Sequence, residues 1–130
     1  MQRPLFVVDS IATVAPEMAG AVVVSGSHGG VSAARYVLAM PAKPHAVFYN
    51  DAGIGKDDAG IVALAMLDHA GVVAATYSHT SARIGDGGDG LDNGLISRVN
   101  VAAAQAGLRG GMRVAAAVQR LRGPDPAHVT

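Results

Sequence analysis

The stretch AVVVSGSHGG, residues 21–30, decides the fold class of this chain, because an uninterrupted apolar run ends there in a polar, glycine-rich loop. The same order recurs in AVFYNDAGIGK at residues 46–56 and in VVAATYSHTSAR at residues 72–83. A short apolar run bounded by such loops is typical of a strand that is buried on both faces of a parallel sheet. The three runs therefore predict three strands, each of which ends in a polar loop.

Segments of helical character separate and follow these strands. The first helical segment, from about residue 31, ends before Pro41, which cannot continue a helix. The next begins near Asp57, a good N-cap residue, and ends at Gly71. Helices are expected over about residues 31–40, 57–71, 95–106 and 112–122. This alternation predicts an α/β fold, a small, mostly parallel sheet of about four strands built from repeated βα units with helices packed on it.

The N-terminal region predicts one more strand, at residues 5–8. Because the link from this strand to residue 21 is short, we expect the first two strands to pair antiparallel. With 130 residues the chain fits one domain, expected over residues 1–123 and followed by a frayed tail at 124–130.

The composition limits the classes of function. Basic and acidic residues cancel at ten each, and they form no basic stripe, which disfavours nucleic-acid binding. The absence of cysteine removes disulfides, zinc–thiolate sites and iron–sulfur clusters. Only 15% of residues are charged, against about 25% on average. So little charge leaves too little polar material to cover a monomer, and we expect a homo-oligomer.

The apolar runs are too short for a membrane protein. No run approaches the ~20 apolar residues of a membrane helix. Asp9 and Ser10 break the first apolar run, so no signal peptide is expected, and a cytoplasmic location is predicted.

The polar loops are expected to meet at one place. In parallel α/β sheets, the loops after the carboxyl ends of the strands share one edge, and ligands bind at that edge. All three of these loops are polar and glycine-rich, whereas residues 41–45 and Gly71, at the opposite edge, are short and plain. No dinucleotide fingerprint or Walker motif accompanies them. The rim of the sheet is therefore the predicted functional site.

The first loop has two interpretations. Its S-x-S-x-G pattern resembles the nucleophile elbow of the α/β-hydrolases, G-x-S-x-G, with Ser25 in place of the first glycine. The resemblance covers about six residues and implies Ser27 as nucleophile, with backbone N–H groups around His28 and Gly29 as the oxyanion site. Glycines before a helix also attract phosphate or carboxylate, with Ser25, Ser27 and His28 as ligands.

The other two loops supply a base and its partner. Asp51 directly follows a buried strand and is expected to orient a histidine, while Lys56 can neutralise a bound anion. His79 follows the next strand and is expected to act as the base, and Arg83 is suited to grip a carboxylate or phosphate. The glycine-rich residues 84–94 form either a lid or a long connector.

These residues predict a small-molecule hydrolase that acts on an amide or ester-like bond of an anionic metabolite. Its catalytic residues are expected to be Ser27, Asp51 and His79, which follow the chain order of the α/β-hydrolase triad. No cofactor is expected in this scheme. The residues expected to bind the substrate are Ser25, Gly26, His28, Gly29, Asn50, Lys56, Ser81 and Arg83.

Two other readings remain open. The side chains of His28, Asp51, His79 and Asp86 are a credible ligand set for a divalent metal in a lyase or hydrolase. The chain can also be a non-catalytic anion-binding domain, or a small subunit whose loops complete the active site of a partner.

Overall fold

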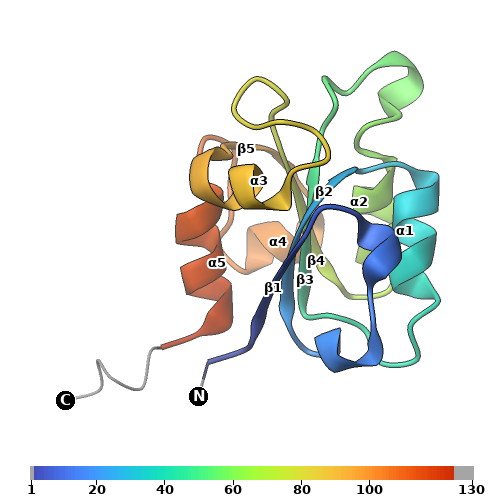
Figure 1. Cartoon of the computed structure of the whole chain (residues 1–130), viewed down its shortest axis with the longest axis vertical. Coiled ribbons are helices and arrows are strands. Elements are labelled where there is room, and N and C mark those ends of the chain that lie inside the picture. The colour runs from blue at the N-terminus through green and yellow to red at the C-terminus, as the bar shows by residue number, and fades with distance from the viewer. Residues whose placement is uncertain (1, 125–130) are drawn as a thin grey trace.

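The computed structural model of the chain describes residues 2–124. Within these residues, five strands form one sheet in the order β1-β2-β3-β4-β5 (Figure 1). The strands are β1 (Leu5–Val8), β2 (Val22–His28), β3 (Ala46–Asn50), β4 (Val73–Tyr77) and β5 (Ile96–Val99). The first four strands run parallel and β5 runs antiparallel to β4, which confirms the predicted α/β fold with a mostly parallel sheet.

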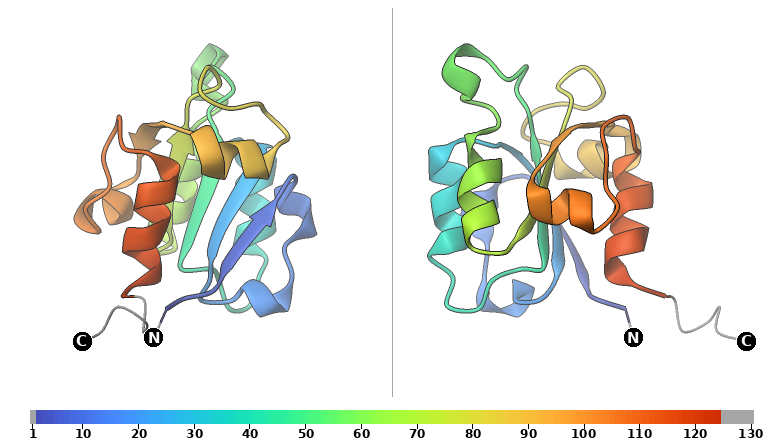
Figure 2. Two further views of the ribbon diagram at one scale, coloured as in Figure 1. Left: turned by 60° about the vertical axis from the view of Figure 1, so that its left-hand side comes forward. Right: turned by 180° about the vertical axis from the view of Figure 1, so that it is seen from behind.

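Helices cover both faces of the sheet. One face carries two of them and the other carries three, because their buried residues divide between two cores. Figure 2 shows helices on both sides of the sheet. The first pair is α1 (Val31–Leu38) and α2 (Val62–His69), and the other three are α3 (Gly87–Asn93), α4 (Val101–Gln105) and α5 (Val114–Arg122). Among residues 2–124, no helix is long and apolar enough to cross a membrane.

The central strands are apolar throughout because both of their faces are buried. In β2, Val22 and Val24 pack with α5, whereas Val23 packs with α1 and α2. Phe48 and Tyr49 of β3 divide in the same way between the two sides. The continuous apolar runs of the sequence therefore fill two separate cores, one on each side of the sheet.

The prediction that the first two strands are antiparallel is wrong. Strand β1 pairs with β2 in parallel, with Leu5 opposite Val22 and Val8 opposite Ser25. Two short 3₁₀ turns, η1 (Ile11–Thr13) and η2 (Pro16–Met18), lead the chain back along the sheet. These turns make the crossover with no α-helix, so the link is shorter than that of an ordinary βα unit.

The prediction of a helix over residues 95–106 is also wrong for the first half of this range. The structure has β5 there, and α4 follows from residue 101. The side chain of Asn100 is the reason, because its Oδ1 accepts a hydrogen bond from the Ala103 amide and so caps α4. The same side chain bonds the backbone of Ala74, Leu64 and Val72. The residues before Asn100 are thereby held against β4.

Helix α2 begins later than predicted. Asp57 does not cap it, since this residue lies in a 3₁₀ turn, η3 (Lys56–Asp58), with φ of 55°. The helix begins at Val62 instead. The predicted tail falls largely on residues 125–130, which lie outside the described residues.

The glycine-rich segment is neither an open lid nor a structureless connector, because it contains α3. Asp86 caps this helix by accepting a hydrogen bond from the Asp89 amide. Gly90 is buried against the ring of Tyr77, and a Cβ added there would lie 2.5 Å from Cζ of that ring. Glycine is required at residue 90 by close packing, and the segment forms part of the fold.

The two glycines Gly88 and Gly90 give a matched test of this packing. We expect Gly90→Ala to lower the free energy of unfolding by about 1–3 kcal/mol, because the added methyl group collides with the Tyr77 ring. Gly88→Ala meets only ordinary contact, 3.5 Å from Asp86 Oδ1, and we expect it to be neutral or to stabilise by up to about 1 kcal/mol. Urea unfolding measures both, and equal losses in the two variants would contradict the packing.

Candidate functional site

The carboxyl ends of β2, β3 and β4 lie side by side at one edge of the sheet. His28 pairs with Asn50, and Asn50 pairs with Tyr77, so the three strands end at the same level. The loops that follow β3 and β4 rise from this end of the molecule in Figure 1. Polar side chains of different loops therefore meet here, and the closest pair is Asp51 and His79.

Asp51 is buried and is held by backbone amides. Its Oδ1 accepts hydrogen bonds from the amide of Gly53 at 2.8 Å and from the amide of His79 at 3.0 Å. Its own amide donates to the carbonyl of Tyr77 at the end of β4. The carboxylate thus joins the loop after β3 to the loop after β4, and its position is fixed by atoms of the main chain.

His79 presents its ring to this carboxylate from the solvent side. Nδ1 lies 3.5 Å from Asp51 Oδ1, and the His79 side chain is 54% exposed whereas that of Asp51 is 5% exposed. The ring lies against Gly53, since a Cβ built there would contact three ring atoms at 3.4–3.6 Å. The approach of Nδ1 to the carboxylate leaves Nε2 as the ring nitrogen available to a ligand.

The surroundings of Asp51 favour its ionised form. Burial by itself raises the pKa of this carboxyl. Hydrogen bonds from the Ser97 hydroxyl and from the amides of Gly53 and His79, together with the charge of His79, outweigh burial and hold the pKa below its usual value. A negative charge is therefore stable beneath the His79 ring at neutral pH.

The loop after Asp51 has a strained backbone. Four successive residues, 52–55, have positive φ, with values of 51° at Ala52 and 68° at Ile54. A β-branched residue such as Ile54 rarely adopts this conformation. The amide of Gly60 donates to the Ile54 carbonyl, and the amide of Ala52 donates to Oδ1 of Asn50. These contacts hold the strained segment against the end of the sheet.

Ser27 lies at the end of β2 and is half-buried. Its Oγ accepts a hydrogen bond from the amide of Ile11 at 2.9 Å, and within residues 2–124 it makes none with His79. The amides proposed for the oxyanion are also engaged, because Gly29 donates to the carbonyls of Asn50 and Gly60. Among the described residues, the structure therefore brings together Asp51 and His79 but does not join Ser27 to them by a hydrogen bond.

Other residues predicted to bind the substrate have structural partners. Ser25 is buried and its hydroxyl donates to the Phe48 carbonyl. Asn50 is buried and its Nδ2 donates to the Ala82 carbonyl. The Gly26 carbonyl accepts a hydrogen bond from the amide of Gly85 at 2.6 Å, which joins the end of β2 to the segment before α3.

The remaining predicted residues lie nearer to solvent. Lys56 and Arg83 are exposed, and the amide of Arg83 donates to Asp89. Ser81 is half-buried and accepts a hydrogen bond from the amide of Leu95. Both cations, Lys56 and Arg83, therefore keep exposed side chains that can bind an anion.

The alternative set of metal ligands is not gathered in one place. His28 folds over Gly30, and Asp86 caps α3. Among residues 2–124, no three histidine or carboxylate side chains are grouped as a metal ion would require. The arrangement gives the metal alternative no support.

Two functional candidates were missed by the sequence reasoning because they lie in β5. Ser97 is one of the groups that lower the pKa of Asp51, and its Oγ lies 3.0 Å from Oγ1 of Thr76. Arg98 lines a hollow of about 520 Å³ between α2 and β5, whose wall also includes Asp57 and Asp58 from the loop after Asp51. The N-capping preference of Asn100 was the available signal that residues 96–99 precede a helix rather than belong to it.

Comparison with known protein families, curated proteins and solved structures finds no match to this chain.

Proposed function

We propose that this chain is a small-molecule hydrolase in which His79, oriented by Asp51, is the general base. The observation that carries the proposal is a buried carboxylate, fixed by two backbone amides, that faces Nδ1 of an exposed imidazole at 3.5 Å. A carboxylate in this position favours the proton on Nδ1 and stabilises the imidazolium that forms when Nε2 accepts a second proton. At 3.5 Å the two side chains are in contact without a hydrogen bond between them, and catalytic hydrogen bonds often form or tighten only when substrate binds.

The strained loop beside Asp51 supports the same location. Residues held in rare backbone conformations cluster at active sites, because the surrounding structure must stabilise them. Ile54 is such a residue, and its loop begins at Asp51 itself. The hollow that Arg98 lines also includes Asp57 and Asp58 from the loop that follows Asp51, and its volume is within the usual range for small-molecule sites.

The attacking group has two candidates. Ser27 has a hydroxyl that accepts one hydrogen bond from Ile11, which leaves its own proton to donate. In that route Oγ attacks the carbonyl carbon, His79 takes the hydroxyl proton and returns it to the leaving group, and water then hydrolyses the acyl-serine. In the second route His79 takes a proton from water as the water oxygen attacks the carbonyl carbon, and it then gives this proton to the leaving group as the ester or amide bond breaks. The engaged amide of Gly29 favours the second route.

An anionic substrate fits the charges available near the rim. Arg83 is exposed and lies in the loop that carries His79, whereas Arg98 shares the wall of the hollow with Asp57, Asp58 and Asp68. A guanidinium group binds carboxylate with two parallel hydrogen bonds. We therefore keep the anionic metabolite as the proposed substrate, with Arg83 as its anchor.

Activity assays on a panel of esters and amides of dicarboxylic acids test this function. We expect His79→Ala to lower kcat/KM by about 10²–10⁴-fold, and Asp51→Asn to lower it in the same direction, because the base is lost or misoriented. His69→Ala is the matched control, since His69 is an exposed histidine at the end of α2.

The same assays separate the two routes. Loss of activity in Ser27→Ala and labelling of Ser27 by a fluorophosphonate support the serine route, whereas retained activity and no labelling support attack by water. If no compound is turned over faster by the natural chain than by His79→Ala, the proposed enzyme is refuted and an anion-binding domain or subunit becomes the better interpretation.

We also propose that the chain is a homo-oligomer, and that β1 contributes to the interface. The amide of Val22 donates to the Pro4 carbonyl, so in the parallel register Leu5 and Val7 turn their backbone groups away from β2. Val7 is 41% exposed on this edge strand, which carries no charge to prevent pairing with another strand. The cytoplasmic location stays a prediction.

Sedimentation tests the oligomer. We expect the chain to sediment as a dimer or larger species and Val7→Lys to shift it toward the monomer, because a charged edge strand resists pairing. A monomer at high concentration would contradict both the composition argument and the role of β1.

A further inference from the structure

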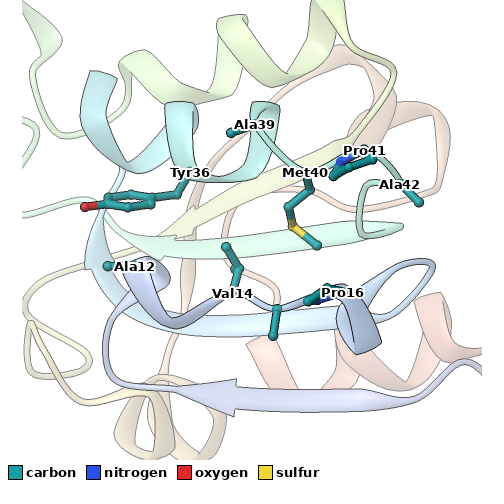
Figure 3. A pocket seen from close by; sticks show the side chains of 9 residues that line it. Ala12, Val14, Pro16, Tyr36, Ala39, Met40, Pro41 and Ala42 are labelled. Carbon is teal, nitrogen blue, oxygen red and sulfur yellow. The ribbon is translucent and has the colours of Figure 1, made fainter.

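A groove flanks the C-terminal end of α1. It has a volume of about 400 Å³ and lies between the last turn of α1 and the link that joins β1 to β2. Figure 3 shows Val14 and Pro16 on one wall, Tyr36 at one end, and Met40 reaching in from the segment that follows α1. Tyrosine apart, every residue that lines the groove is apolar. Its volume is within the roughly 300–1,000 Å³ of small-molecule sites.

The groove opens into a second hollow that carries a charge. This hollow, of about 360 Å³, shares Tyr36 and Ala39 with the groove and adds Ser32 and Arg35. These four residues recur at i, i+3, i+4 and i+7, so they form one outward stripe of α1. The opposite stripe of α1, which includes Ala34 and Val37, is buried against the sheet.

The stripe changes from cationic to apolar along the helix. Arg35 and Ala39 are four residues apart, about 6 Å along the helix axis, and Met40 follows directly after Ala39, the C-cap residue. Lys43, whose Nζ donates to the Met40 carbonyl, lines neither hollow, so Arg35 is the cation among their lining residues. A ligand that matches this pattern has an apolar body of comparable length and one anionic end.

We propose that this groove binds a medium-chain or aryl carboxylate, with its apolar body against Val14 and Met40 and its carboxylate on Arg35. Exposed apolar concavities of this kind mark ligand or partner sites. The cationic end selects the anion, because a guanidinium pairs with carboxylate through two parallel hydrogen bonds. This site is separate from the Asp51–His79 pair, and it does not depend on the proposed hydrolase activity.

Calorimetric titration of the purified chain with octanoate tests the site. We expect saturable binding of octanoate and much weaker binding of butyrate, which is too short to fill the groove, and of octanol, which lacks the charge. Arg35→Gln should weaken octanoate binding about tenfold or more, because a charge-assisted hydrogen bond is lost. Arg109→Gln is the matched control, since Arg109 is also exposed and does not line either hollow.

A second variant fills the space without removing charge. Ala39 is exposed and shared by both hollows, so Ala39→Leu should block binding while the melting temperature stays near that of the natural chain. Absence of octanoate binding, or binding that neither variant weakens, would overturn the proposal. Failure to bind octanoate together with a loss of self-association in Ala39→Leu would overturn it in favour of an interface between copies.

Discussion

The carboxylate of Asp51 is the group on which the candidate site depends. A buried charge is costly unless it is hydrogen-bonded, and here the amides of Gly53 and His79 supply those bonds. The same two bonds fix where the loops after β3 and β4 begin their paths. One buried acid therefore sets the conformation of both loops and places a negative charge beneath an exposed imidazole. The carboxylate that orders the two loops is thus the same group that is proposed to orient His79.

The rigidity of the site comes from the parallel strands beneath it. Because His28, Asn50 and Tyr77 pair across β2, β3 and β4, the carboxyl ends of these strands stop at one level, although the register of β2 shifts between Val24 and His28. Glycine packing extends this order into the loops, as at Gly90 against the ring of Tyr77. The glycines of the rim provide close approach between segments, and they leave His79 as an exposed group on an ordered support.

The sequence was sufficient for the central strands and for the Asp51–His79 pair, because long apolar runs followed by polar loops have few structural interpretations. It was insufficient for β5, since the four residues of ISRV fit a helix as well as a strand, and only contacts of Asn100 with distant backbone decide between them. Ser97 was missed for that reason. The engaged amide of Gly29 was also beyond prediction, because its acceptor at Gly60 depends on how a strained loop folds back.

The most direct test of the account is the tautomer of His79, read from ¹⁵N chemical shifts of selectively labelled histidine at a pH where the ring is neutral. Free histidine in water favours the proton on Nε2, whereas a carboxylate at Nδ1 reverses this preference. The account predicts that His79 carries its proton on Nδ1 and that Asp51→Ala returns the ring to the behaviour of free histidine. A His79 ring with its proton on Nε2 in the natural chain would contradict it.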